Sequence, residues 1–87
     1  MDPASYLKYG LLVIQHAQEY GDYGLCKVII KDILNSFPLN EAIAINDKVN
    51  ILTIANKIKE KSIIPEFEEL YTVLFAIKTY DNSYKKF

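Results

Sequence analysis

Apolar residues recur along this chain at spacings of three and four positions, which is the period of an α-helix that buries one face. The first such segment covers residues 2–20, and Gly21 is expected to end it. Asp2 suits the N-cap of this helix, and Pro3 suits its first helical position. The face expected to be buried comprises Leu7, Leu11, Val13, Ile14, Ala17 and Tyr20.

A second helix is predicted between Asp22, its N-cap, and Pro38, which ends it. Its β-branched residues would also suit a strand. However, Lys27 and Lys31 lie four positions apart, on the side opposite the apolar stripe of a helix. The expected inner residues are Cys26, Ile29, Ile30, Ile33 and Phe37.

A third helix is predicted over residues 41–59, with Asn40 as its N-cap. A later start near Asn46 and Asp47 is the alternative, because both residue types favour the N-cap. The expected inner residues are Ile45, Val49, Leu52, Ala55 and Ile58.

A fourth helix is predicted to begin at Pro65 and to end at the polar residues 81–83. Glu66, Glu68 and Glu69 lie at its start, where negative charge stabilises the helix dipole. The expected inner residues are Phe67, Leu70, Tyr71, Leu74 and Ile77. Short connections favour antiparallel neighbours, so the predicted fold is all-α, an antiparallel up-down four-helix bundle. Residues 1–87 are expected to form one domain, with residues 81–87 as a flexible tail.

Composition narrows the classes of function. The 87 residues include ten lysines, no arginine and eleven acidic residues, so the net charge is −1. Because nucleic-acid binding requires a basic surplus, we expect no nucleic-acid partner. We also expect no membrane insertion, since no apolar run is long enough and no secretory signal is recognisable. The single cysteine, Cys26, precludes an intrachain disulfide and favours a reducing compartment, so the expected location is the cytoplasm.

Candidate catalytic residues are few. His16 is the sole histidine, and Glu19 is the one acidic residue that helical spacing places beside it. Cys26 belongs to an apolar stripe, where a thiol behaves as a small hydrophobic group. Residues 21–24 have the glycines of a phosphate-binding loop but lack the preceding strand and the lysine. We therefore expect no enzyme activity, catalytic residue, metal site or cofactor; a subunit of a small enzyme is the remote alternative.

One helical hairpin resembles a tetratricopeptide repeat over residues 7–38. The residues that carry this resemblance are Gly21, Asp22, Tyr23, Cys26, Ile30 and Pro38. No second copy follows 34 residues later, although such repeats stack to bury their faces. The resemblance implies an adaptor that binds other proteins, and a viral or phage helical interaction module is a related alternative.

A second resemblance covers more of the chain. It is carried by Phe37-Pro38-Leu39, Val49, Leu52, Ile64-Pro65, Leu70-Tyr71 and Leu74. These residues are similar to those of the immunity proteins of pediocin-type bacteriocins, which are small cytosolic four-helix bundles. The resemblance implies self-protection of a producing cell by recognition of a bacteriocin-occupied membrane receptor from its cytosolic side. The nearly neutral charge departs from the basic balance common in that family.

The last helix and the tail are the predicted partner-binding region. The apolar arc of this helix spans roughly 220°, wider than the single stripe of an ordinary surface helix. Aromatic residues in the polar tail are of the types that anchor interfaces. The predicted partner-binding residues are Leu70, Tyr71, Val73, Leu74, Phe75, Tyr80, Tyr84 and Phe87. The sequence leaves open what covers the wide apolar arc of this helix. The alternatives are a protein partner, a second copy of this chain and the first helix.

Overall fold

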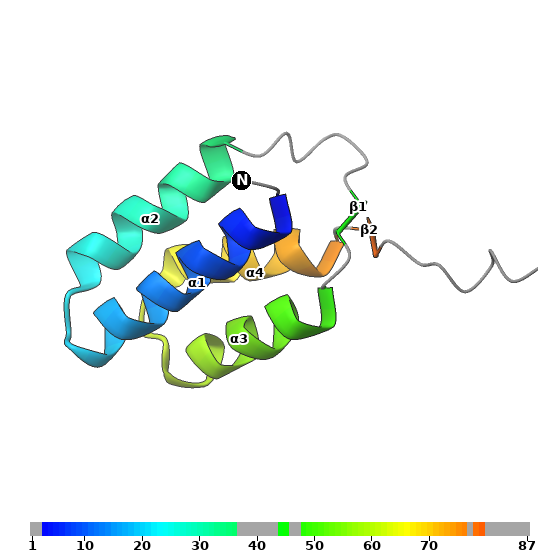
Figure 1. The fold of residues 1–87 in the computed structure, drawn as a ribbon. Coiled ribbons are helices and arrows are strands. Elements are labelled where there is room, and N and C mark those ends of the chain that lie inside the picture. The colour runs from blue at the N-terminus through cyan, green and yellow to red at the C-terminus, as the bar shows by residue number, and fades with distance from the viewer. Residues whose placement is uncertain (1–2, 37–43, 46–47, 77, 80–87) are drawn as a thin grey trace, which may run out of the picture.

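The computed structural model describes residues 3–36, 44–45, 48–76 and 78–79. These described residues form four helices and one pair of two-residue strands (Figure 1). In chain order they are α1 (Pro3–Glu19), α2 (Tyr23–Ser36), β1 (Ala44–Ile45), α3 (Lys48–Lys61), α4 (Pro65–Ala76) and β2 (Lys78–Thr79). The predicted all-α four-helix fold is confirmed.

The turn between α1 and α2 follows the local chemistry that its sequence predicts. Gly21 has a φ of 77°, a left-handed conformation that a residue with a Cβ rarely adopts. The amide of Asp22 donates to the Ala17 carbonyl over 2.8 Å, which closes the end of α1. The Asp22 carboxylate then accepts a hydrogen bond of 3.2 Å from the Leu25 amide. Asp22 is therefore the N-cap of α2, as predicted.

The turn between α3 and α4 is short and partly buried. The Ile64 amide donates to Ser62 Oγ over 3.2 Å, and the Ile64 carbonyl accepts from the Phe67 amide over 3.1 Å. The Ile64 side chain is buried and belongs to the core, a role that its place in a link did not predict. Pro65 begins α4, as expected from its fixed φ and missing amide hydrogen.

The helices form two antiparallel hairpins that pack face to face (Figure 1). α1 packs against both α2 and α3, whereas α4 packs against α2 and α3 from the opposite side. α1 and α3 run in the same direction (Figure 1), and near their carboxyl ends Gln18 Nε2 donates to the Ile58 carbonyl over 3.2 Å. The pairs joined by short turns, α1–α2 and α3–α4, are antiparallel, as the short connections predict. Residues 37–47 separate α2 from α3, and this longer connection lets α3 lie beside α1.

The core lies between the two hairpins and is apolar throughout. Among the described residues, Phe67 is the largest of the fully buried side chains. The buried set comprises Leu7, Leu11, Ile14, Ala17, Cys26, Ile30, Ile33, Ile51, Ala55, Ile58, Ile64, Phe67, Leu70 and Leu74. Each helix contributes positions spaced three or four apart, as the sequence pattern predicts.

Two of the predicted inner residues lie at the surface instead. Tyr20 is 87% exposed because it falls in the turn that follows α1. Val49 is 75% exposed. The buried face of α3 is formed by Ile51, Ala55 and Ile58, and Val49, two positions before Ile51, lies about 200° away around the helix axis. Val13, Ile29, Leu52 and Tyr71 are half-buried at the edges of the core.

Two predicted helix boundaries also differ from the structure. The third helix was predicted to cover residues 44–45, but these pair in parallel with residues 78–79, Ala44 opposite Lys78 and Ile45 opposite Thr79. The later start, near Asn46 and Asp47, is the alternative that agrees with α3. The fourth helix ends at Ala76, short of the predicted break, because the chain enters this strand pair. Phe37 and Ile77 lie outside the described residues.

Candidate protein-binding surfaces

The structure divides the predicted partner-binding residues into three groups. Leu70 and Leu74 are 0% and 2% exposed, so they are core residues and cannot contact a partner of the folded chain. Tyr71 and Val73 are half-buried, and Phe75 is 62% exposed. Tyr80, Tyr84 and Phe87 lie outside the described residues.

Tyr71 and Phe75 form an ordered aromatic pair on the outer side of α4. Their ring centroids are 6.5 Å apart and the planes meet at 28°, an offset stack of the kind that aromatic rings prefer. Lys59 Nζ lies 4.2 Å from the Tyr71 ring centroid, and Lys48 Nζ lies 5.6 Å from that of Phe75. Both distances suit a cation–π interaction, so α3 supplies a cation to each ring of α4.

Hydrogen bonds hold this arrangement in place. The Tyr71 hydroxyl donates to Asn56 Oδ1 over 2.7 Å. Lys48 Nζ donates to the Phe75 carbonyl over 2.6 Å, where a cation also stabilises the negative end of the α4 dipole. We call this surface the aromatic face; it consists of Lys48, Asn56, Lys59, Tyr71 and Phe75. A shallow hollow of about 280 Å³ lies beside it, lined by Lys59, Glu68, Tyr71, Thr72 and Phe75.

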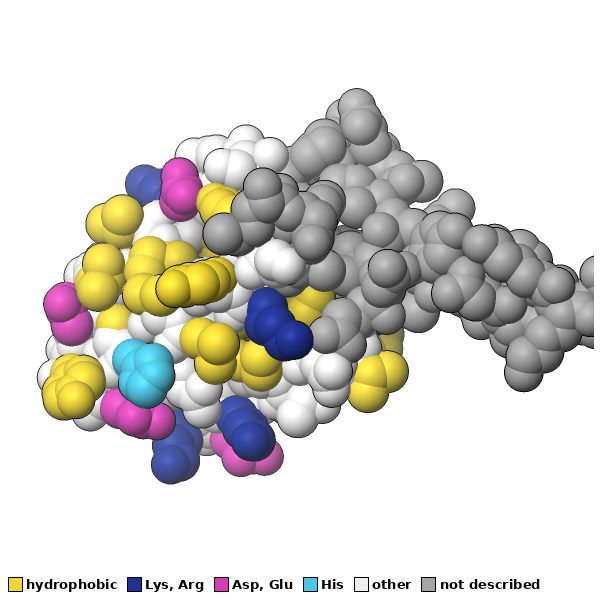
Figure 2. Space-filling view, viewed as in Figure 1, with side chains coloured by type: hydrophobic (Ala, Val, Ile, Leu, Met, Phe, Trp, Pro, Cys, Tyr) yellow, Lys and Arg dark blue, Asp and Glu magenta, His cyan; other side chains and the backbone are white. Residues whose placement is uncertain are grey.

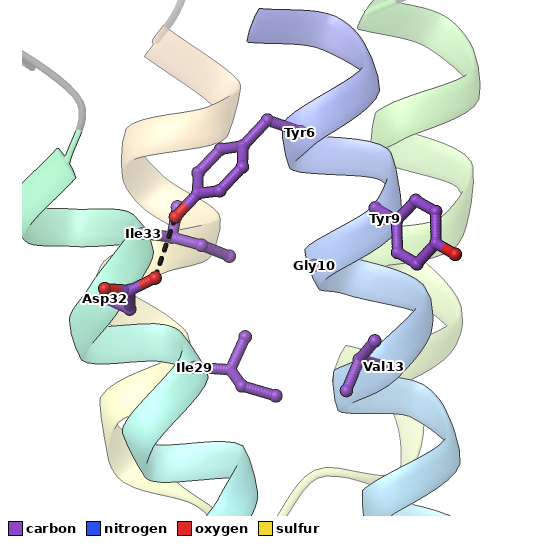
Figure 3. Close-up of a pocket in the computed structure, with 7 residues that line it drawn as sticks. All are labelled: Tyr6, Tyr9, Gly10, Val13, Ile29, Asp32 and Ile33. Carbon is purple, nitrogen blue, oxygen red and sulfur yellow. Dashed lines mark hydrogen bonds between the residues drawn. The ribbon is translucent and has the colours of Figure 1, made fainter. Parts of the chain in front are cut away.

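A second candidate surface, which the sequence analysis did not predict, lies between α1 and α2 (Figure 3). It is a hollow of about 270 Å³ lined by Tyr6, Tyr9, Gly10, Val13, Ile29, Asp32 and Ile33. Tyr6 from α1 and Ile29 from α2 point into the space between the helices, whereas the ring of Tyr9 turns away from α2 (Figure 3). We call this hollow the α1–α2 groove.

Gly10 allows the two helices to approach at the floor of the groove. A Cβ at this position would lie 2.8 Å from Ile33 Cδ1, closer than carbon atoms tolerate. At one end of the groove, the Tyr6 hydroxyl donates to Asp32 Oδ2 over 2.9 Å. The one sequence signal for this feature was a glycine inside a helical pattern, which is costly for a helix unless packing requires it.

The two residues considered for catalysis lie apart from both surfaces. His16 is exposed on α1. Cys26 is fully buried, and its Sγ lies 3.5 Å from the Ile14 carbonyl, to which it donates. Burial, with a smaller contribution from the negative charge of Asp22, raises the pKa of the Cys26 thiol. In the described part of the chain, no three His, Cys, Asp or Glu side chains are placed to hold a metal ion.

The raised pKa predicts an inert thiol in the native protein. Cys26 should react with a soluble thiol reagent at least about tenfold more slowly in the native chain than in denaturant. Its contribution to stability is complete below the unfolded pKa, about 8.5, and is lost as the pH rises towards the folded value. The free energy of unfolding should therefore fall more between pH 7 and pH 9.5 in the wild type than in Cys26→Ala. Equal reaction rates in the native and unfolded chains would contradict this prediction.

No protein-family model, curated protein or solved structure matches this chain. The two resemblances named above are therefore carried by the quoted residues alone. Among the described helices, none has both the length and the apolar character needed to span a bilayer.

Proposed function

We propose that this chain binds a partner protein and that the aromatic face is the surface of contact. The observation that supports this proposal is Phe75, a large apolar side chain that is 62% exposed yet held in a defined position. Aromatic side chains are enriched among the residues that carry most of the binding energy of interfaces. An exposed ring without a partner exposes apolar surface to water at a cost in free energy.

The order of the aromatic face favours binding further. The Tyr71 ring is held by Asn56, by Lys59 and by its stack with Phe75. Because these side chains are already ordered, a partner that covers them loses little additional conformational entropy on association. Lys59 also offers a positive charge beside the rings, which suits a partner surface that combines apolar and acidic groups.

The specific function we propose is immunity to a pediocin-type bacteriocin. Its support is the resemblance carried by Ile64-Pro65, Leu70-Tyr71 and Leu74, together with the four-helix fold of the described residues. Pro65 begins the last helix here, as it does in that family. The partner would then be a membrane receptor reached from its cytosolic side. A tetratricopeptide-like adaptor remains the alternative, since α1 and α2 form a hairpin around Gly21.

Phe75→Ser tests the proposed function in a strain that is sensitive to a pediocin-type bacteriocin. We expect the wild-type chain to protect this strain and Phe75→Ser to reduce the protection at least about tenfold, because truncating an interface anchor typically costs 2 kcal/mol or more. Since Phe75 is largely exposed, the melting temperature of the Phe75→Ser variant should differ from that of the wild type by only a few degrees.

Tyr20→Ser is the matched control, since Tyr20 is also an exposed aromatic but lies in the α1–α2 turn. It should retain the protection of the wild type. Absence of protection by the wild-type chain would refute the immunity function. Equal protection by Phe75→Ser and the wild type would refute the aromatic face as the site.

A further inference from the structure

We propose that the α1–α2 groove docks an amphipathic helix of a partner protein, one that carries a large apolar anchor and a lysine or arginine about one turn away. This goes beyond the proposed function, because the groove lies on the hairpin of α1 and α2 and the aromatic face lies on that of α3 and α4. The two surfaces share no residue.

The size of the groove suits one large apolar side chain. Its volume is about 270 Å³. An apolar cavity of about 150 Å³ already binds benzene, so this space admits a leucine or phenylalanine side chain. Gly10 forms the floor, where its lack of a side chain leaves room for Ile33 to pack closely against α1. Val13 and Ile29 provide apolar walls from the two helices.

Apolar surface continues beyond the groove along α2. Val28 and Leu25 are 64% and 41% exposed, and Tyr9, which lines the groove from α1, is 66% exposed. Figure 2 shows hydrophobic side chains gathered over α1 and α2 on the face that this view presents. Exposed apolar residues that gather on one side of a protein indicate an interaction surface more often than scattered ones do.

The charge in the groove defines the chemistry of the occupant. Among the described residues that line it, Asp32 is the only one that carries a formal charge. Asp32 accepts a hydrogen bond from Tyr6, and an ionised carboxylate has further lone pairs for a second donor. A lysine or arginine of the partner would complement this carboxylate, whereas an acidic side chain would be repelled.

A helix is the occupant that fits the shape of this site. The groove runs between two antiparallel helices, and helices pack by inserting the ridges of one into the grooves of its neighbours. α1 has 17 residues, about 25 Å, along which a partner helix of four to five turns fits. Successive turns are about 5.4 Å apart, which allows an anchor in the hollow and a cation at Asp32 on the same face.

The probe is a model amphipathic helix of about 18 residues, with leucines along one face and lysines beside them. Fluorescence anisotropy of the labelled peptide measures its affinity for the full chain. We expect saturable binding below about 1 mM, and binding at least about tenfold weaker when glutamate replaces every lysine. In Asp32→Asn this preference for the lysine peptide should fall to less than about threefold. No saturable binding, or equal affinity for the two peptides, would overturn the proposal.

A matched pair of variants locates the binding. Ile29 and Ile54 are both half-buried isoleucines that pack against the core, but only Ile29 lines the groove. We expect Ile29→Ala to weaken binding of the lysine peptide about tenfold, and Ile54→Ala to change it less than about twofold. Equal losses of peptide affinity in both variants would show that the weaker binding follows from lower stability of the fold and not from lost contacts in the groove. Phe75→Ser should leave peptide binding unchanged, so the failure of either proposal is separable from the failure of the other.

Discussion

Replacing Phe67 with alanine is expected to lower the free energy of unfolding by about 3–5 kcal/mol. Phe67 is 1% exposed and lies in the first turn of α4, where that helix joins the core. Removing the ring loses its transfer free energy and leaves a cavity between hairpins that cannot fully collapse. Urea unfolding followed by circular dichroism measures the change. For a domain of this size, the loss is comparable to much of the total stability.

Phe75→Ala is the control, because it makes the same substitution on the same helix at a site that is 62% exposed. It should cost less than about 1 kcal/mol, most of it through the lost contacts with Tyr71 and Lys48. Similar losses in the two variants would show that the core does not lie between the hairpins as described.

Ile30→Ala is expected to cost about 2–5 kcal/mol, the range for truncation of a packed aliphatic side chain. Ile30 is 1% exposed on α2, and α2 packs against both α1 and α4. Truncating the Ile30 side chain therefore weakens the packing within the α1–α2 hairpin and the contact between this hairpin and the α3–α4 hairpin. Leu74→Ala, on the facing helix α4, should fall in the same range because Leu74 is 2% exposed.

Val28→Ala provides the comparison for Ile30→Ala, since Val28 is also β-branched, lies two positions away and is 64% exposed. Its cost should stay below about 0.5 kcal/mol, and alanine's higher helix propensity offsets part of it. A loss below about 0.5 kcal/mol for both Ile30→Ala and Leu74→Ala would mean that the buried faces are wrongly assigned.

The two candidate surfaces differ in how far the sequence reveals them. The wide apolar arc of the fourth helix predicted that some of its residues stay exposed, and Phe75 confirms this. The pattern placed Leu70 and Leu74 on the inner face and Phe75 at its edge, but all three were named as partner-binding residues, because helical periodicity alone does not say how much of a wide face a neighbour covers. The α1–α2 groove depends on the approach of two helices at Gly10, which no pattern within one helix contains.

The sequence by itself determined the local features of this protein. The helical period, Gly21 as the end of α1, Asp22 as the N-cap of α2 and Pro65 as the start of α4 all depend on interactions within a few residues. Such interactions are readable because chain neighbours are always close in space. The all-α class and most of the buried residues followed from this period.

Only the tertiary structure decided which helices become neighbours. The packing of α1 beside α3, the strand pair that stops α4 at Ala76 and the exposure of Val49 depend on residues far apart in the chain. Several arrangements of four amphipathic helices bury nearly the same apolar area, so the hydrophobic pattern does not distinguish them. The choice rests on close packing, such as that of Gly10 against Ile33, and on contacts such as the hydrogen bond from Gln18 to Ile58. These are properties of pairs of helices, which is why the folded chain reveals them and the pattern along it does not.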